Sequence, residues 1–173
     1  MKLSLGGVRL KRLKEQDLEM LRTWRNDPKI RRVMFFQEHI TRDMQLKWFT
    51  SLSELDSYFV IETGNKSVGL IHLNIDEKDK YSAFAGLFIH DDSYWGTQVP
   101  VYSSLALLNF AFKELDLKQV LAKVRKDNSA AIRYNQSLGF SAIQEECQVL
   151  TKNDFFRRTQ SLYDRLKKEK PSQ

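Results

Sequence analysis

Few residues of this sequence could do chemistry, and the first of them is a tyrosine. Segment 124–140, VRKDNSAAIRYNQSLGF, is typical of a strand end followed by a helix that begins after Asn128. Tyr134 lies six residues after Asn128, and a phenol beside a leaving group can act as a general acid. The tyrosine also shares a helical face with Ala131 and Leu138. The alternative is therefore a core residue whose hydroxyl is satisfied nearby.

A second candidate for proton transfer is His72. It lies in a run typical of a strand, opposite in phase to Ile71 and Leu73, so its side chain faces either a substrate or solvent. The ordinary pKa of an imidazole suits proton transfer near neutral pH, but a lone histidine on a strand is more often structural. The sequence leaves both interpretations open.

Length and composition predict one domain that carries these side chains. The 173 residues are 42% hydrophobic and 29% charged, which suits a domain with a sizeable core. We expect this domain over residues 1–166 and a frayed tail over 167–173. Cys147 is the only cysteine, and the first residues lack the apolar run of a secretory signal. We therefore expect a protein of the reducing cytoplasm. No stretch approaches the roughly 20 apolar residues that span a bilayer, so no membrane partner is expected.

The charge of the chain favours an anionic ligand. The formal net charge is +6, and basic residues gather in segment 22–32, RTWRNDPKIRR. Charge alone does not separate nucleic acid from a phosphorylated small molecule. Because we find no aromatic platform and no nucleic-acid-binding signature, we expect a small-molecule ligand and no nucleic acid. We also expect no metal.

The apolar periods predict a mixed fold, α/β (α+β), without repeats or linkers. Asp27 and Pro28 predict the start of a short helix, and Thr41 predicts a cap for a helix with Met44, Trp48 and Leu52 on one face. The predicted strands lie at 7–13, 57–63, 68–76, 81–90 and 118–124, with a closing hairpin of 141–150 and 155–166; the predicted helices lie at 15–26, 29–34, after Thr41, from the loop 91–100 to Leu115, and at 129–138.

Three groups of motifs carry a resemblance to a known family. The YWGTQVP loop with its helix, a strand, and then N-x-x-A-x-x-Y-x-x-x-L-G-F from Asn128 to Phe140 resemble the GNAT superfamily of N-acetyltransferases. RLKEQDLEMLRTWRND and VGLIHL are similar to the subgroup that acetylates amino sugars, ribosomal proteins and polyamines. WRNDPKIRRVMFFQEHIT and LKWFTSL are most similar to bacterial N-acetyltransferases of nucleotide-linked amino sugars, such as those that feed pseudaminic acid synthesis.

This resemblance implies a fold and an activity. The fold is a strongly twisted mixed sheet of about seven strands flanked by helices. The activity is transfer of acetyl from acetyl-CoA to a primary amine, and the amine expected here belongs to an anionic nucleotide-linked sugar. A protein amino terminus, a polyamine and a non-catalytic binding domain are the alternatives. The oligomeric state stays open, with a homodimer as one alternative.

The resemblance also assigns roles to residues. Tyr134 would protonate the departing CoA thiolate, and His72 is the candidate base. Arg25 could meet a phosphate while Phe35 and Trp48 form an apolar wall, although each of these side chains could equally be structural. The substrate set is Arg25, Met34, Phe35 and Trp48. The acetyl-CoA set is Leu87, Phe88, Ile89, His90, Trp95, Gly96, Thr97, Gln98, Val99, Val101, Asn128 and Ala131.

The sequence departs from the family pattern at two places. The family loop reads Gln/Arg-x-x-Gly-x-Gly/Ala, whereas this chain has Gly96, Gln98 and Pro100, and a proline has no N–H to give to a pyrophosphate. Phe84 aligns with the glutamate that serves many relatives as the base. We therefore expect acetyl-CoA binding through fewer donors, and a base of another kind or none.

Overall fold

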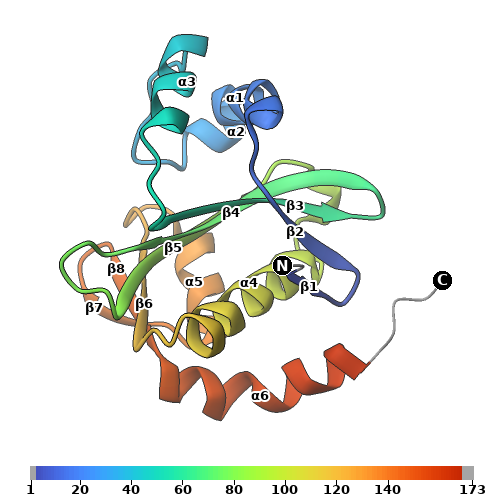
Figure 1. The fold of residues 1–173 in the computed structure, drawn as a ribbon, viewed down its shortest axis with the longest axis vertical. Helices are drawn as coiled ribbons and strands as arrows, with labels where there is room; N and C mark the ends of the chain where they lie inside the picture. Colours follow the sequence, from blue (N-terminus) through green and yellow to red (C-terminus); the bar gives the residue numbers. More distant parts are fainter. Residues whose placement is uncertain (1–2, 169–173) are drawn as a thin grey trace.

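A computed structural model describes residues 3–168 of the chain. One eight-stranded sheet, in the order β1-β2-β3-β4-β5-β6-β8-β7, separates two groups of helices, with α1, α2 and α3 on one side and α4, α5 and α6 on the other (Figure 1). The strands are β1 (Leu3–Leu5), β2 (Val8–Arg12), β3 (Asp56–Thr63), β4 (Lys66–Ile75), β5 (Ser82–Ile89), β6 (Gln119–Lys123), β7 (Ser141–Gln144) and β8 (Cys147–Thr151). The helices are α1 (Leu18–Asn26), α2 (Pro28–Arg31), α3 (Arg42–Thr50), α4 (Val99–Asn109), α5 (Ser129–Leu138) and α6 (Lys152–Lys168), with short turns at Glu15–Asp17, Asp92–Tyr94 and Phe110–Glu114.

The sheet opens in its middle. Strands β1 to β5 form an antiparallel meander, and β5 then pairs with β6 in parallel. That parallel pairing covers only Ser82, Ala83 and Phe84. Within the described residues, positions 85–89 of β5 pair with β4 on one side and leave the other backbone edge open. The fold therefore presents a strand edge inside the molecule, beside the start of α4.

Successive side chains of the strands point to opposite faces, and each face has its own core. Val60, Leu70 and Phe88 are buried against the side chains of α1 and α2. Their sequence neighbours Ile61, Ile71 and Ile89 are buried in the larger core with α4. The first three helices are thus held by one face of the sheet, and α4 by the other.

Local capping chemistry explains where several helices begin. Asp27 accepts a hydrogen bond from the Lys29 N–H while Pro28 occupies the first position of α2, as predicted. Thr41 caps α3 through the Met44 N–H, also as predicted. Asn128 accepts from the Ala131 N–H at 3.1 Å at the start of α5, and Gly139 ends that helix with a left-handed φ of 103°.

The last predicted hairpin is wrong. Segment 155–166 was expected to be a strand, yet residues 152–168 form α6, which buries Phe155 and Thr159 one helical turn apart. The residues that start helix α6 are Thr151 and Asp154. Thr151 Oγ1 accepts a hydrogen bond from the Asp154 N–H and donates one to the Asp154 carboxylate. Thr-x-x-Asp is a helix-start signature rather than a hairpin turn.

Smaller corrections follow from the same comparison of sequence and structure. The hairpin spans residues 141–151 and turns at Glu146, whose φ is 60°. α3 ends at Thr50, so Leu52 lies outside it. The mixed α/β fold class is confirmed, with eight strands instead of about seven. Of the tail predicted at 167–173, residues 167 and 168 belong to α6 and 169–173 lie outside the described residues. None of the helices described is long and apolar enough to cross a membrane.

Candidate active site

A cavity of about 1020 Å³ passes from one side of the sheet to the other where β5 and β6 diverge. Its walls come from α1 to α3 and the segment between α2 and α3, from β3 to β6, and from α4 and α5. The cavity therefore joins the predicted substrate side to the predicted cofactor side. Of the residues predicted from the sequence, it is lined by Arg25, Met34, Phe35, Trp48, His72, Leu87, Phe88, Ile89, Trp95, Gly96, Asn128, Ala131 and Tyr134.

The open edge of β5 has free backbone groups. The His90 N–H donates to the Val68 carbonyl on β4 at 2.8 Å. Because backbone groups alternate along a strand, those of Leu87 and Ile89 point away from β4, toward the divergence. The Ile89 carbonyl is taken by the Trp95 indole N–H at 3.0 Å. The Leu87 groups and the Ile89 N–H remain for an extended ligand that pairs as an added strand would.

His90 is one of the predicted cofactor residues that do not line this cavity. Its N–H faces β4, its ring stacks on Trp24 with centroids 5.3 Å apart, and its Nε2 lies 3.2 Å from Asp27 Oδ2. It lines a separate, shallower pocket beside α1. Trp24 is buried in the smaller core, on the face of α1 that also carries Leu18 and Leu21.

The start of α4 provides backbone donors beside the cavity. Gly96 has a φ of 75°, which an L-residue adopts only with strain, and it turns the chain into the helix. In the described part of the chain, the N–H groups of Gly96, Gln98 and Val101 meet no acceptor. Pro100 supplies none, and the Val99 N–H is 3.3 Å from Thr97 Oγ1. Thr97, Gln98, Val99 and Val101 do not line the cavity itself. Free N–H groups at a helix start are suited to an anionic group.

Tyr134 joins α5 to α4 at the cavity wall. Its hydroxyl donates to the Pro100 carbonyl at 2.8 Å and lies 2.7 Å from Ser104 Oγ. A phenol has one proton, so Ser104 is the donor in the second contact. Burial raises the pKa of Tyr134, which keeps the phenol protonated at neutral pH. The hydroxyl is therefore satisfied as a core tyrosine requires, and it must release Pro100 before it can protonate anything else.

His72 lies on the cavity face of the sheet between Tyr58 and Gly86, its partners in register on β3 and β5. Its ring stacks on Tyr58 with centroids 5.2 Å apart. A Cβ on Gly86 would come 2.8 Å from His72 Cε1, so the glycine leaves room for the imidazole. Burial, and next the charge of Arg25, lower the pKa of His72 to about 4. The imidazole is neutral at pH 7 but a weak base.

Arg25 extends from α1 into the cavity, and no residue that the structure describes forms an ion pair with it. Its Nε is buried and has no hydrogen-bond acceptor in the described part of the chain. Burial lowers the pKa of its guanidinium, and the neighbouring Tyr58 acts in the opposite direction. A buried donor without an acceptor is costly, which makes Arg25 a site for a ligand oxygen.

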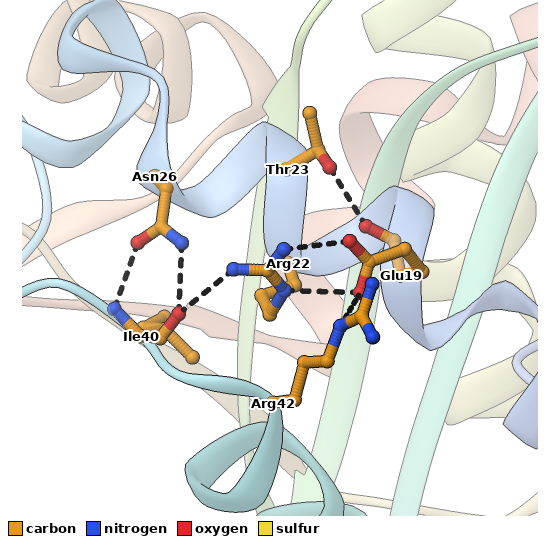
Figure 2. A network of polar contacts seen from close by, with 6 residues as sticks. All are labelled: Glu19, Arg22, Thr23, Asn26, Ile40 and Arg42. Atoms are coloured by element: carbon orange, nitrogen blue, oxygen red, sulfur yellow. Dashed lines mark hydrogen bonds and ion pairs between the residues drawn. The ribbon is translucent and has the colours of Figure 1, made fainter.

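The segment between α2 and α3 is fixed by polar contacts to α1 (Figure 2). Asn26 accepts from the Ile40 N–H at 2.8 Å and donates to the Ile40 carbonyl at 2.9 Å. Arg22 reaches the same carbonyl at 3.4 Å, and Glu19 pairs with both Arg22 and Arg42. This segment, residues 32–41, carries Met34 and the half-exposed Phe35 at the cavity wall.

The ionisable groups of the cavity are strongly biased toward positive charge. Among the residues that the structure describes, no aspartate or glutamate lines it. Sequence reasoning identified Arg25 but missed Tyr58 and Ser104, because strand register and helix packing bring them to the wall. It also missed two cations at the end of β6. The basic residues are Arg25, Lys29, Arg32, Lys123 and Arg125.

A comparison with models of protein families assigns the sequence to a family. Residues 8–141 match the model described as acetyltransferase (GNAT) domain. The chain belongs to the GNAT acetyltransferase family. Where the resemblance places a glutamate in many GNAT enzymes, Phe84 lies on the cavity wall with the Lys123 ammonium 4.8 Å from its ring centroid. The structure thus has a phenylalanine with a neighbouring cation over its ring, and no carboxylate, at that position.

Known structures share the GNAT fold of this chain. Apo FdhC, a nucleotide-linked sugar GNAT, has a TM-score of 0.79 at 18% identity, over 96% of this chain and 98% of that one. Spermidine N-acetyltransferase from Vibrio cholerae, in complex with CoA and spermine, has a TM-score of 0.75 at 17% identity, over 87% and 98%. An uncharacterized protein of Methanocaldococcus jannaschii is 22% identical over 133 residues. The match covers 76% of this chain but only 27% of that relative.

Proposed function

We propose that the protein is an acetyl-CoA-dependent N-acetyltransferase whose acceptor is the primary amine of a nucleotide-linked amino sugar. The observation that carries the proposal is the charge of the cavity, which has five basic side chains and, in the described chain, no carboxylate. Lys29 and Arg125 pair with Asp92 and Asp127 outside the lining, whereas Arg25 has no such partner. A cationic cavity attracts the diphosphate of a sugar nucleotide and repels a polyamine.

The chain offers the groups that acetyl-CoA would need. Leu87 and Ile89 have free backbone groups on the open edge of β5, and the start of α4 has free N–H groups for a pyrophosphate. The loss of one donor at Pro100 leaves Gly96, Gln98 and Val101. When bound, acetyl-CoA supplies an activated acetyl thioester.

The acceptor nitrogen must lose two protons during the transfer, one before it attacks and one as the amide forms, and the CoA sulfur must gain one; the net product is one proton released to solvent. The acceptor ammonium must lose a proton so that its nitrogen lone pair can attack the acetyl carbon. The neutral imidazole of His72 or solvent water receives it, since no carboxylate of the described chain is at hand. As the carbon–sulfur bond breaks, the sulfur takes up a proton, and the hydroxyl of Tyr134 holds one at the cavity wall.

Acceptor competition tests the proposal. The purified protein, with acetyl-CoA in excess, should acetylate a uridine-diphosphate-linked amino sugar with a higher kcat/KM than spermidine. Arg25→Ala should raise the KM for the sugar nucleotide roughly 10- to 100-fold, because one charge-assisted hydrogen bond contributes about 1.5 to 3 kcal/mol. The KM for acetyl-CoA should stay unchanged.

A matched control separates recognition from loss of bulk charge. Arg165 is exposed on α6, and Arg165→Ala removes the same charge away from the cavity, so its kinetics should equal those of the wild type. A preference for spermidine, or equal effects of Arg25→Ala on both substrates, would contradict the proposal. A protein that binds no acetyl-CoA would favour the non-catalytic alternative.

A further inference from the structure

At the cavity wall, the side chains of Arg25 and Tyr58 carry hydrogen-bond donors for which the described residues show no acceptor. One is the buried Nε–H of Arg25. The other is the hydroxyl of Tyr58, which accepts a hydrogen bond from Asn74 Nδ2 at 2.9 Å and therefore keeps its own proton for another partner. In the described part of the chain that proton has no acceptor as the side chains are placed, and Asn74 Oδ1, the buried acceptor on the neighbouring amide, is itself without a partner. Donors that are left unpaired on folding point to an oxygen that comes with a ligand.

Tyr58 is held firmly on the cavity face of the sheet. Its ring stacks on His72 and receives the edge of Trp48, whose centroid is 4.8 Å away at an interplanar angle of 86°. Asn74 lies two residues after His72 on β4 and therefore on the same face. The amide of Asn74 occupies one side of the phenol oxygen and turns the hydroxyl proton away from itself.

Arg25 and Tyr58 lie within electrostatic reach of each other. Burial raises the pKa of Tyr58, and the Asn74 hydrogen bond and the charge of Arg25 act in the opposite direction. Tyr58 in turn raises the pKa of Arg25 against the effect of burial. Both side chains line the same cavity, so a ligand bound there can contact both.

We infer that the Arg25 guanidinium and the Tyr58 hydroxyl together bind one anionic oxygen group of the acceptor, a phosphate or a carboxylate, and that Asn74 is a positioning residue for the Tyr58 hydroxyl. The inference rests on the proposed function only for the identity of the acceptor. A guanidinium supplies donors in a plane, and a neighbouring hydroxyl adds a donor from another direction. Because Tyr58 covers His72, this anion site lies beside the candidate base.

Anion titrations of the CoA-saturated protein test the site without requiring turnover. Saturation with CoA occupies the donors at α4. Inorganic phosphate or succinate is then added at constant ionic strength, with sodium chloride as the reference, and the affinity is measured by calorimetry. We expect at least one of the two anions to bind the wild type. Binding of phosphate alone identifies a phosphate group as the natural ligand, binding of succinate alone identifies a carboxylate, and binding of both supports the shared chemistry.

Tyr58→Phe removes the hydroxyl and keeps both ring contacts, so the variant should fold. Its affinity for the anion should fall roughly tenfold or more. Tyr81→Phe is the matched control, because Tyr81 is 60% exposed and lies outside the cavity, and it should bind as the wild type does. The inference is overturned if neither anion binds more than chloride does, or if Tyr58→Phe binds the anion with unchanged affinity.

Asn74→Ala tests the positioning role. The Asn74→Ala variant should bind the anion as weakly as the Tyr58→Phe variant does. The double variant should bind it no more weakly than either single variant, since both changes act through one hydroxyl. Additive effects, or an unchanged affinity in Asn74→Ala, would show that Asn74 does not position the Tyr58 hydroxyl.

The two proposals can fail separately. Anion binding that depends on Tyr58 in a protein that acetylates no sugar nucleotide would contradict only the proposed function. Acetylation of sugar nucleotides with an unchanged KM in Tyr58→Phe would sink only this inference.

Discussion

At the scale of single residues, Tyr134 shows how far a sequence pattern reaches. Its helix, its apolar stripe and its place in the family motif follow from neighbours within ten positions. Its contacts with Pro100 and Ser104 join positions 34 and 30 residues apart, and no local pattern specifies them. The two interpretations of Tyr134, acid and core residue, are compatible with one hydroxyl that serves both.

Tyr134→Phe separates these contributions. The change removes a buried hydroxyl with two hydrogen bonds, so the free energy of unfolding should fall by about 1 to 3 kcal/mol. If the phenol protonates the leaving sulfur, kcat should also fall by about 10²-fold, while the affinity for acetyl-CoA stays close to that of the wild type. Calorimetry and steady-state kinetics measure both.

Ser104→Ala provides the control for that experiment. It takes one partner from the same hydroxyl but leaves the phenol proton in place. Stability should fall as it does for Tyr134→Phe, whereas kcat should change much less. A phenylalanine variant that melts early yet turns over at the wild-type rate would leave Tyr134 as a core residue only.

At the scale of elements, the parts that could be predicted are those with local chemistry. Asp27 with Pro28, Thr41, and Asn128 with Gly139 specify helix ends through contacts within a few residues, and the sequence located all of them. The sequence predicts a strand where the structure has helix α6, because the aromatic residues of this segment favour a strand and segment 151–154 resembles a turn. The cations at the end of β6 reach the cavity through the divergence from β5, which depends on strand pairing over long range.

The segment 32–41 is an element without regular structure, and its position depends on Asn26. Asn26→Ala removes both hydrogen bonds to Ile40, so stability should fall by about 1 to 2 kcal/mol. Because the freed segment carries Met34 and Phe35, the KM for the acceptor should rise severalfold while the KM for acetyl-CoA stays constant. Steady-state kinetics with each substrate varied in turn measure this split.

Asn153→Ala is the matched control, since Asn153 is exposed on α6 and does not line the cavity. Its kinetics should be those of the wild type. If Asn26→Ala changes the two KM values equally, or changes neither, segment 32–41 does not contribute to acceptor recognition. The contacts of Asn26 would then matter for folding alone.

At the scale of the whole molecule, one sheet separates two cores and the cavity crosses it where the strands diverge. Groups from both sides therefore meet in a place that is partly withdrawn from water. The same withdrawal lowers the pKa of His72 to about 4, and no residue that the structure describes forms an ion pair with Arg25. A site of this kind lowers the stability of the free protein and improves the match to an anionic ligand.

The pH dependence of unfolding measures that cost. An imidazole in the unfolded chain has a pKa of about 6.5, and that of folded His72 is about 4, so between these values the unfolded state binds more protons. The free energy of unfolding should therefore fall as the pH drops from about 6.5 to about 4, by roughly 1 to 3 kcal/mol from this residue.

Urea unfolding of His72→Gln beside the wild type isolates the effect, because the contributions of carboxylates cancel in the difference. The stability of the wild type relative to His72→Gln should decline between pH 7.5 and pH 5. A difference that stays constant over this range would show that His72 titrates alike in the folded and unfolded states, so that burial does not depress its pKa.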